Sequence, residues 1–168
     1  MSQEHDALDR IIAQWKNERP DLDPAPMGIV GRVFQLSKLF EQRLEEVFKK
    51  YGLASWSFDV LVALRRVGAP YRQNPTDLFN SLLLSSGAMT NRIDRLEAAE
   101  LVTRIPDPED RRAVLVQLTP KGLKLIDSIM PEHLQNEERL LGKLSAGERK
   151  EMAELLRKLI LTTGVRGE

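Results

Sequence analysis

Cysteine is absent from the 168-residue chain, which excludes disulfide bonds, thiolate metal sites and thiol redox sensing. The chain also lacks any apolar run close to the roughly 18 residues that a membrane span needs, so we expect no association with a membrane. Its N-terminal residues are polar and acidic, unlike a secretory signal, and this predicts a cytoplasmic protein. The chain does have 42% hydrophobic residues, enough for one domain or two interlocked lobes.

Net charge is also lacking, because 25 basic and 25 acidic residues cancel to a formal charge of zero. No global electrostatic field therefore favours nucleic acid as a partner. The charges are unevenly distributed, however. Residues 1–30 hold three basic and six acidic side chains, whereas residues 60–124 hold ten basic and seven acidic ones. The middle of the chain is thus its cationic part, although chance scatter along a charge-rich surface explains the difference equally well.

Apolar residues at every third or fourth position predict helices toward both ends of the chain. They indicate a short amphipathic helix at 6–17, a long helix at 28–51 and two C-terminal helices at 120–143 and 146–162. The last three carry more apolar surface than a small domain can cover, so we expect them to form a homodimer with a second copy of the chain. An intramolecular bundle without a dimer is the alternative.

The middle of the chain predicts three shorter helices. Ser55 is suited to cap the first of them. The run Asn74–Asp77 supplies a cap, a proline at the first helical position and an acidic residue for the second helix, which extends to about residue 83. The third helix, at 86–99, has one apolar stripe, formed by Met89, Ile93 and Leu96.

Two β-branched segments, at 101–105 and 113–118, flank a polar loop and predict a β-hairpin. Two helices joined by a tight turn and followed by a hairpin make a winged helix-turn-helix, which lays its second helix in a DNA major groove. The predicted fold class is therefore mainly α with a small β-hairpin wing. The predicted domains are an N-terminal extra helix and linker at 1–27, a helical dimerisation region at 28–54 and 120–168, and the DNA-binding winged helix-turn-helix at 55–119.

The second helix of this winged unit has an outward face suited to DNA. Thr90, Asn91 and Arg95 offer donors and acceptors that reach base edges and phosphates. Ser85 and Ser86 lie at its start, where hydroxyls and free backbone amides suit a phosphate. A helix cap and a solvated face are the ordinary alternative.

Arg111 and Arg112 lie at the tip of the predicted wing, directly after the acidic Asp110. If Asp110 bonds the loop backbone or a neighbouring arginine, Arg112 is free to enter a narrow minor groove, where a guanidinium is favoured. A surface ion pair is the alternative. A twofold dimer sets two recognition helices about one helical turn, roughly 34 Å, apart and selects palindromic DNA.

No constellation of residues points to catalysis, a metal or a cofactor. The two histidines, His5 and His133, lie far apart, and neither a glycine-rich phosphate loop nor a serine elbow is present. His133 and Glu137 share a helix face, but two ligands without a third are expected on a solvated surface. We therefore predict a protein that is not an enzyme and has no metal and no cofactor.

Three stretches resemble the MarR family of dimeric winged-helix transcription regulators, and the resemblance spans most of residues 28–162. They are Asn74–Leu78, Leu82–Glu97, and Asp107–Arg112 running into Val116–Thr119. By that resemblance, the helix from Ser86 reads the major groove and Arg112 enters the minor groove. Glu100 and Ala113 depart from the pattern, because relatives often have glycine at these positions, and both concern the angle of the hairpin.

A narrower resemblance, to the urate-responsive branch of that family, rests on the extra helix with Trp15 and on the segment Ser57–Leu61. It implies that Trp15 and Arg92 contact an anionic purine, that the anion displaces Asp59, and that Arg104 relays the shift to the recognition helix. The chemistry fits, since an indole stacks, a guanidinium offers paired donors and a carboxylate is repelled by an anion. A core contact of Trp15 and an ion pair between Asp59 and Arg104 are the structural alternatives.

These observations together predict a repressor that binds a palindromic operator as a homodimer and is released by urate or a related anionic purine. Arg92 flanks the apolar stripe, so its side chain can point inward, away from DNA. A sensor of phenolic or lipophilic compounds has little need for Arg92 and is one alternative. A winged-helix module that binds protein instead of DNA is the other, because a fold alone does not fix a function.

Overall fold

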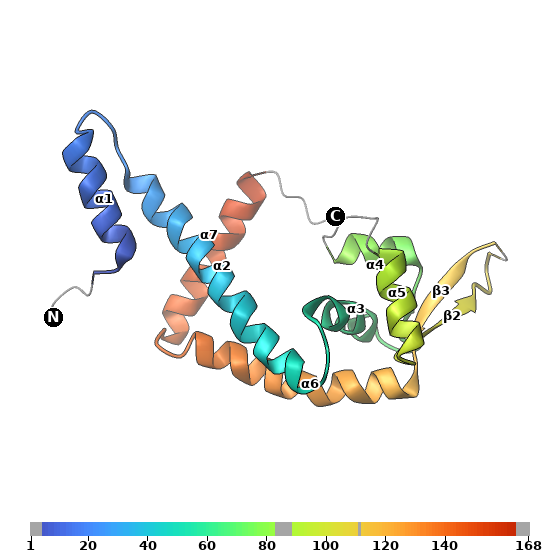
Figure 1. The fold of residues 1–168 in the computed structure, drawn as a ribbon. Helices are drawn as coiled ribbons and strands as arrows, with labels where there is room; N and C mark the ends of the chain where they lie inside the picture. Colours follow the sequence, from blue (N-terminus) through green and yellow to red (C-terminus); the bar gives the residue numbers. More distant parts are fainter. Residues whose placement is uncertain (1–4, 83–88, 111, 164–168) are drawn as a thin grey trace. The chain divides into compact units, whose positions relative to one another are not determined.

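The computed structural model describes residues 5–82, 89–110 and 112–163. Its contacts divide the chain into two compact units, Met1–Arg43 and Leu44–Glu168. The boundary falls inside α2 (Ala25–Lys50), so this helix contributes to both units (Figure 1). The described residues form helices and one small antiparallel sheet, which confirms the predicted fold class. The predicted domain limits stay predictions.

In the N-terminal unit, α1 (Ala7–Glu18) packs on the first part of α2. Leu8 is buried over Gly31, where an added β-carbon would lie 2.5 Å from the Leu8 Cδ1 atom. Asp6, the N-cap of α1, accepts a 2.8 Å hydrogen bond from the Nε atom of Arg32. An apolar contact and an ion pair therefore hold α1 against α2.

The second unit contains three short helices that follow one another along the chain. These are α3 (Ser55–Arg66), α4 (Pro75–Ser81) and α5 (Met89–Ala98). The backbone N–H of Asp77 donates to the Asn74 side chain at 2.8 Å, which confirms the predicted cap of α4. The predicted capping role of Ser55 is wrong, because Ser55 is already the first helical residue and Ala54 is the N-cap, without a side-chain bond.

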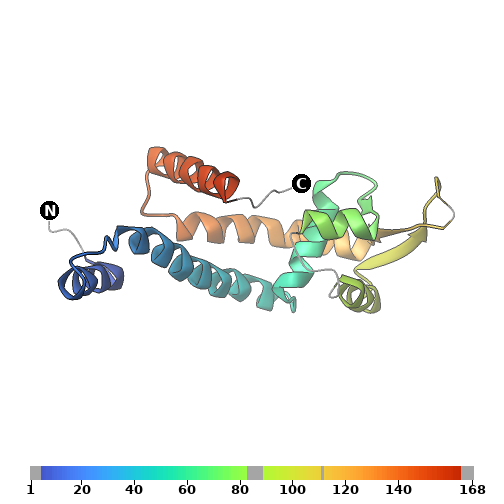
Figure 2. The same ribbon diagram turned by 90° about the horizontal axis from the view of Figure 1, so that it is seen from above.

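The sheet has three antiparallel strands. They are β1 (Arg72–Gln73), β2 (Val102–Pro106) and β3 (Val114–Leu118), in the order β1-β3-β2. In the β2–β3 hairpin, Val102 lies opposite Leu118 and Pro106 opposite Val114, so the predicted wing is confirmed. Figure 2 shows this hairpin extending beyond α3, α4 and α5. The prediction missed β1, since a strand of two residues has no alternating pattern to detect.

Two helices complete the second unit: α6 (Pro120–Leu140), which contains Pro131, and α7 (Ala146–Thr162). Gly122 in the first turn of α6 lies against the backbone of Leu101. An added β-carbon on Gly122 would be 2.0 Å from the Leu101 carbonyl oxygen, so only glycine fits this crossing. The predicted capping box at the start of α7 is also present. Among the described residues, no helix is both long and apolar enough to cross a membrane.

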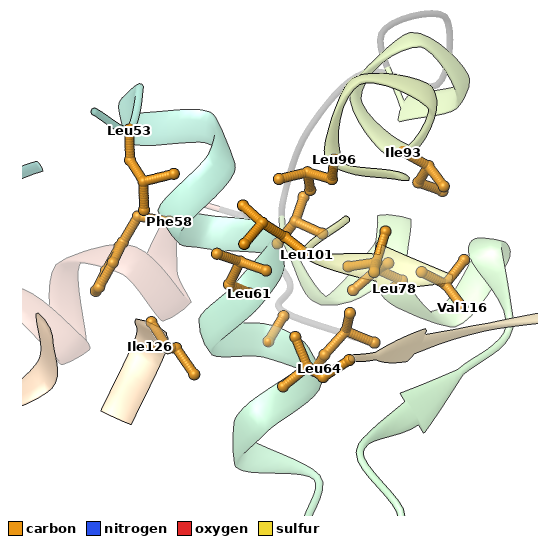
Figure 3. Close-up of a cluster of buried hydrophobic side chains, with 14 of the residues drawn as sticks. Leu53, Phe58, Leu61, Leu64, Leu78, Ile93, Leu96, Leu101, Val116 and Ile126 are labelled. Carbon is orange, nitrogen blue, oxygen red and sulfur yellow. The ribbon is translucent and has the colours of Figure 1, made fainter. Parts of the chain in front are cut away.

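The hydrophobic core of the second unit is centred on α3, whose Leu61 and Leu64 are fully buried. Figure 3 shows them surrounded by apolar side chains from other elements of the unit, including Ile93 of α5, Val116 of β3 and Ile126 of α6. The core therefore fixes α5 and the wing on one scaffold.

Candidate DNA-binding face and ligand site

The two faces of α5 differ in burial as the sequence predicts. Met89, Ile93 and Leu96 are buried in the core. The candidate DNA contacts Thr90, Asn91 and Arg95 are all exposed. Three polar side chains are thus free to approach a groove while the opposite face is fixed. The candidates Ser85 and Ser86 lie outside the described residues.

The wing loop is held by Asp110. Its carboxylate accepts a 2.9 Å hydrogen bond from the backbone N–H of Arg112, and its carbonyl accepts one of 2.9 Å from Ala113. This is the backbone bonding that the sequence interpretation required of Asp110. The side chain of Arg112 is exposed and forms no ion pair with any described residue, so it is free to reach a ligand. Arg111 lies outside the described residues.

Glu100, which departs from the family pattern, lies in the turn that leads into the wing. This residue has a positive φ of 60°, a left-handed conformation that glycine adopts without strain. Its carboxylate receives a 3.1 Å hydrogen bond from Lys121 of α6. Ala113, the other departure, does not have a positive φ. The turn therefore forms with a glutamate at the position where the family resemblance leads us to expect a glycine.

Arg92 points inward, as predicted, and is half-buried. Its guanidinium carbon lies 5.8 Å from the centre of the Trp56 ring of α3. Its Nη1 atom is buried and has no hydrogen-bond partner among the described residues. A buried guanidinium nitrogen without an acceptor is costly, and an anion that reaches it satisfies it.

Asp59 shares this environment. Burial raises the pKa of its carboxyl above the usual value, against the opposing electrostatic effects of Arg92 and His133. The carboxylate is thus only partly compensated, and a second negative charge near Arg92 would compete with it for the same guanidinium.

His133 of α6 corrects the sequence interpretation. The prediction of a solvated surface is wrong for His133, because only 9% of this residue is exposed, whereas the side chain of Glu137 is 46% exposed. Its ring lies 4.6 Å from Phe58 and 5.6 Å from Phe48, and its Nε2 atom is 3.2 Å from a Glu137 carboxylate oxygen. The apolar period of α6 did not identify it, because histidine is not an apolar residue. Among the described residues no group of three metal-ligating side chains could hold an ion.

Arg104 of β2 is bound to α5. Its Nη2 atom lies 2.5 Å from a carboxylate oxygen of Asp94, its Nη1 atom bonds Glu97, and its backbone N–H donates to Glu97 at 2.9 Å. These contacts, the backbone hydrogen bond first, hold the pKa of Glu97 below its usual value. The suggested ion pair with Asp59 is therefore wrong, and Arg104 connects β2 to α5.

Trp15 lies in the N-terminal unit, with 45% of its surface exposed. The alternative that Trp15 forms the core contact of α1 is wrong, because Leu8 makes that contact. With Gln14 and Glu18, Trp15 lines a surface depression on α1. Trp56, in contrast, lies beside Arg92 in the second unit, and the sequence interpretation missed it. Its spacing of three residues from Asp59 was the available signal.

Helix α5, fixed by its buried face and followed by the β2–β3 wing, defines a winged helix-turn-helix protein of the kind that binds DNA. The sequence model that describes the MarR family matches residues 56–114 of this chain. The transcriptional regulator PecS of Dickeya dadantii is 42% identical over 146 residues, which cover 87% of this chain and 88% of PecS. The chain belongs to the MarR family, whose members are transcriptional regulators and not enzymes.

Two solved structures are similar in both fold and sequence. A mutant MarR from E. coli in complex with operator DNA has a TM-score of 0.71 and 25% identity, with 93% of this chain and 99% of that chain covered. BpsR of Bordetella bronchiseptica, whose DNA binding is regulated by 6-hydroxynicotinic acid, has a TM-score of 0.68 and 30% identity, with coverage of 77% and 91%. The family therefore includes regulators that respond to small molecules.

Proposed function

We propose that this protein is a repressor that binds a palindromic operator as a homodimer and releases it when a small anion binds. The observation that carries the DNA-binding part is the division of α5. Thr90, Asn91 and Arg95 are exposed, opposite the side chains that fix the helix in the core. The free side chain of Arg112 on the wing supplies a second contact, suited to the minor groove.

The dimer is supported by α7. This helix buries no residue and exposes apolar side chains, including 60% of Leu155 and 70% of Leu161. Water does not favour such a face unless a partner covers it, and a second copy with the same face is self-complementary under twofold symmetry. Two recognition helices then read two half-sites.

The proposed effector is urate or a related anionic purine, which binds Arg92 and displaces Asp59. The buried Nη1 atom of Arg92, which lacks an acceptor, supports an anion over a neutral lipophilic ligand. Asp59 is already destabilised by burial and is repelled when an anion arrives. The closest alternative is an aromatic acid, since BpsR responds to 6-hydroxynicotinic acid.

Release requires that the ligand favour the arrangement that does not fit DNA. Arg104 supplies the connection, because it joins β2 to Asp94 and Glu97 of α5. A tenfold weaker operator affinity corresponds to about 1.4 kcal/mol of coupling, and DNA must weaken ligand binding by the same factor.

Fluorescence anisotropy of a labelled duplex from the upstream region of the gene tests the proposal, at two salt concentrations and then with urate. We expect tight, salt-dependent binding that urate reverses. Binding that ignores urate contradicts the effector but not the regulator. Absence of salt-dependent binding to operator candidates and random duplexes favours the protein-binding alternative.

Two arginines on α5, three residues apart, give a matched pair of variants. Arg92→Ala should bind DNA within about twofold of wild type and fail to respond to urate, because the residue faces Trp56 and not solvent. Arg95→Ala should lose about tenfold in DNA affinity, with a reduced salt dependence, and keep the response to urate. Normal urate release by Arg92→Ala would contradict the ligand site.

A further inference from the structure

Trp56 and Asp59 lie three residues apart on α3 and therefore share one side of the helix. Both act on the same group of α5: Trp56 lies under the guanidinium of Arg92, and the charge of Arg92 acts on the carboxylate of Asp59. The arginine is thus positioned by two groups of one helix, one aromatic and one negative.

The two groups leave different parts of the guanidinium available. A guanidinium over an aromatic ring uses its flat face, so its N–H edge stays available for an acceptor. The buried Nη1 atom has no acceptor among the described residues, although a carboxylate acts on the same arginine. The contact with Trp56 therefore restrains Arg92 without consuming its hydrogen-bonding capacity.

Trp56 is well placed to restrain the arginine, because its ring is half-buried and packs against the hydrophobic core. Core packing fixes the ring, so an arginine held over it loses little further freedom when a ligand binds. A long, mobile side chain without this surface has to be ordered by the ligand itself, which lowers affinity.

We propose that Trp56 is a positioning residue of the ligand site, which holds Arg92 so that its N–H edge meets an anion with two acceptors side by side. This inference rests on the proposed function and deepens it. The favoured ligand class is a planar oxo-heterocyclic anion or a carboxylate, because either presents two acceptors to one guanidinium edge. A single-atom anion such as chloride gains less from this arrangement.

The test measures the urate concentration that half-releases the operator for full-length Trp56→Leu and Trp56→Phe. Leucine keeps apolar packing but removes the π surface, and phenylalanine keeps part of it. We expect about a tenfold higher urate concentration for Trp56→Leu and about threefold for Trp56→Phe. Operator affinity without urate should stay within about twofold, since Trp56 lies on α3, outside the proposed DNA contacts.

The chain supplies a matched control. Arg65 lies over the ring of Tyr71 at 4.9 Å, a second arginine–aromatic pair in the same unit that does not involve Arg92. Tyr71→Leu removes an aromatic ring from beneath an arginine and should leave the response to urate unchanged. An equal loss of response in Tyr71→Leu and Trp56→Leu would attribute both to general damage and overturn the inference.

A spectroscopic measurement separates positioning from packing. The chain has two tryptophans, and Trp15 lies in the other compact unit, so Trp15→Phe leaves Trp56 as the only tryptophan whose emission is followed. Adding Arg92→Met to this variant should shift the emission of Trp56, and urate should change that emission only while Arg92 is present. Readings are corrected for urate absorbance with free tryptophan amide.

The outcomes distinguish the two proposals. If urate does not release the operator from the wild-type protein, the proposed effector is wrong, and so is the proposed role of Trp56 in binding it. Release of the wild type together with normal release of Trp56→Leu, or emission of Trp56 that is indifferent to Arg92, overturns the inference alone.

Discussion

Helices α5 and α7 differ in what they bury. Of the ten residues of α5, Met89, Ile93 and Leu96 are buried in the core of the second unit. None of the 17 residues of α7 is buried, and its exposed apolar side chains are Leu155, Leu156, Leu159, Ile160 and Leu161. The proposed recognition helix is therefore stabilised within one chain, whereas α7 needs a partner. The stability of α5 should therefore not depend on protein concentration, whereas the stability of α7 should rise with it.

The largest expected effect is on stability and comes from disturbing the packing of the second unit, which holds α5 without a partner chain. Gly122→Ala places a β-carbon 2.0 Å from the Leu101 carbonyl oxygen, where backbone must move. We expect the free energy of unfolding to fall by about 3 kcal/mol, as for an overpacked core, in urea denaturation followed by circular dichroism.

Gly147→Ala is the control in α7, because nothing lies within 4 Å of its added β-carbon. This change should leave the free energy of unfolding unaltered or raise it by up to about 1 kcal/mol, through helix propensity. Equal destabilisation by the two substitutions would contradict the comparison.

The next largest effect is on dimerisation and concerns α7. Leu159→Glu puts a charge into the exposed apolar face of α7 and should weaken the dimer by about 2 kcal/mol, measured by sedimentation equilibrium. Lys158→Glu, one residue away, is the control and should leave dimerisation almost unchanged. A dimer insensitive to Leu159→Glu would mean that α7 is not the interface.

The same contrast separates what the sequence could predict. Caps and short-range periods predicted the start of α4, the buried stripe of α5 and the wing, because neighbours in sequence determine them. Burial of His133 and the contact of Trp56 with Arg92 depend on packing between helices distant in sequence. The pattern around a single residue carries no record of such contacts, so the sequence could predict neither the burial of His133 nor the position of Trp56 beside Arg92.

The smallest expected effect is a pH-dependent change in stability at Asp59, in α3 of the second unit. Burial holds the pKa of its carboxyl above the usual value, so the folded protein binds a proton at a higher pH than the unfolded chain does. The ionised carboxylate therefore lowers stability above the folded-state pKa, and this cost disappears as the pH falls through that pKa.

Asp59→Asn should accordingly raise the melting temperature at pH 7, and the gain should shrink toward acidic pH. Thermal melts across this range test it. Glu151→Gln on α7 removes the same charge from an exposed site and should show no such gain. A gain that is independent of pH would exclude burial of the carboxylate as its cause.

The bonds of Arg104 have one further consequence, for the operator. Arg104 bonds β2 to Asp94 and Glu97 of α5. These bonds hold α5 and the wing at a fixed position relative to each other. If α5 reads bases and Arg112 enters the minor groove, as proposed, the distance between these two contacts within a half-site stays constant. An effector can then alter only the spacing between the winged units of the two subunits in the proposed dimer. The response of an operator to the effector should therefore depend on the number of base pairs between its half-sites.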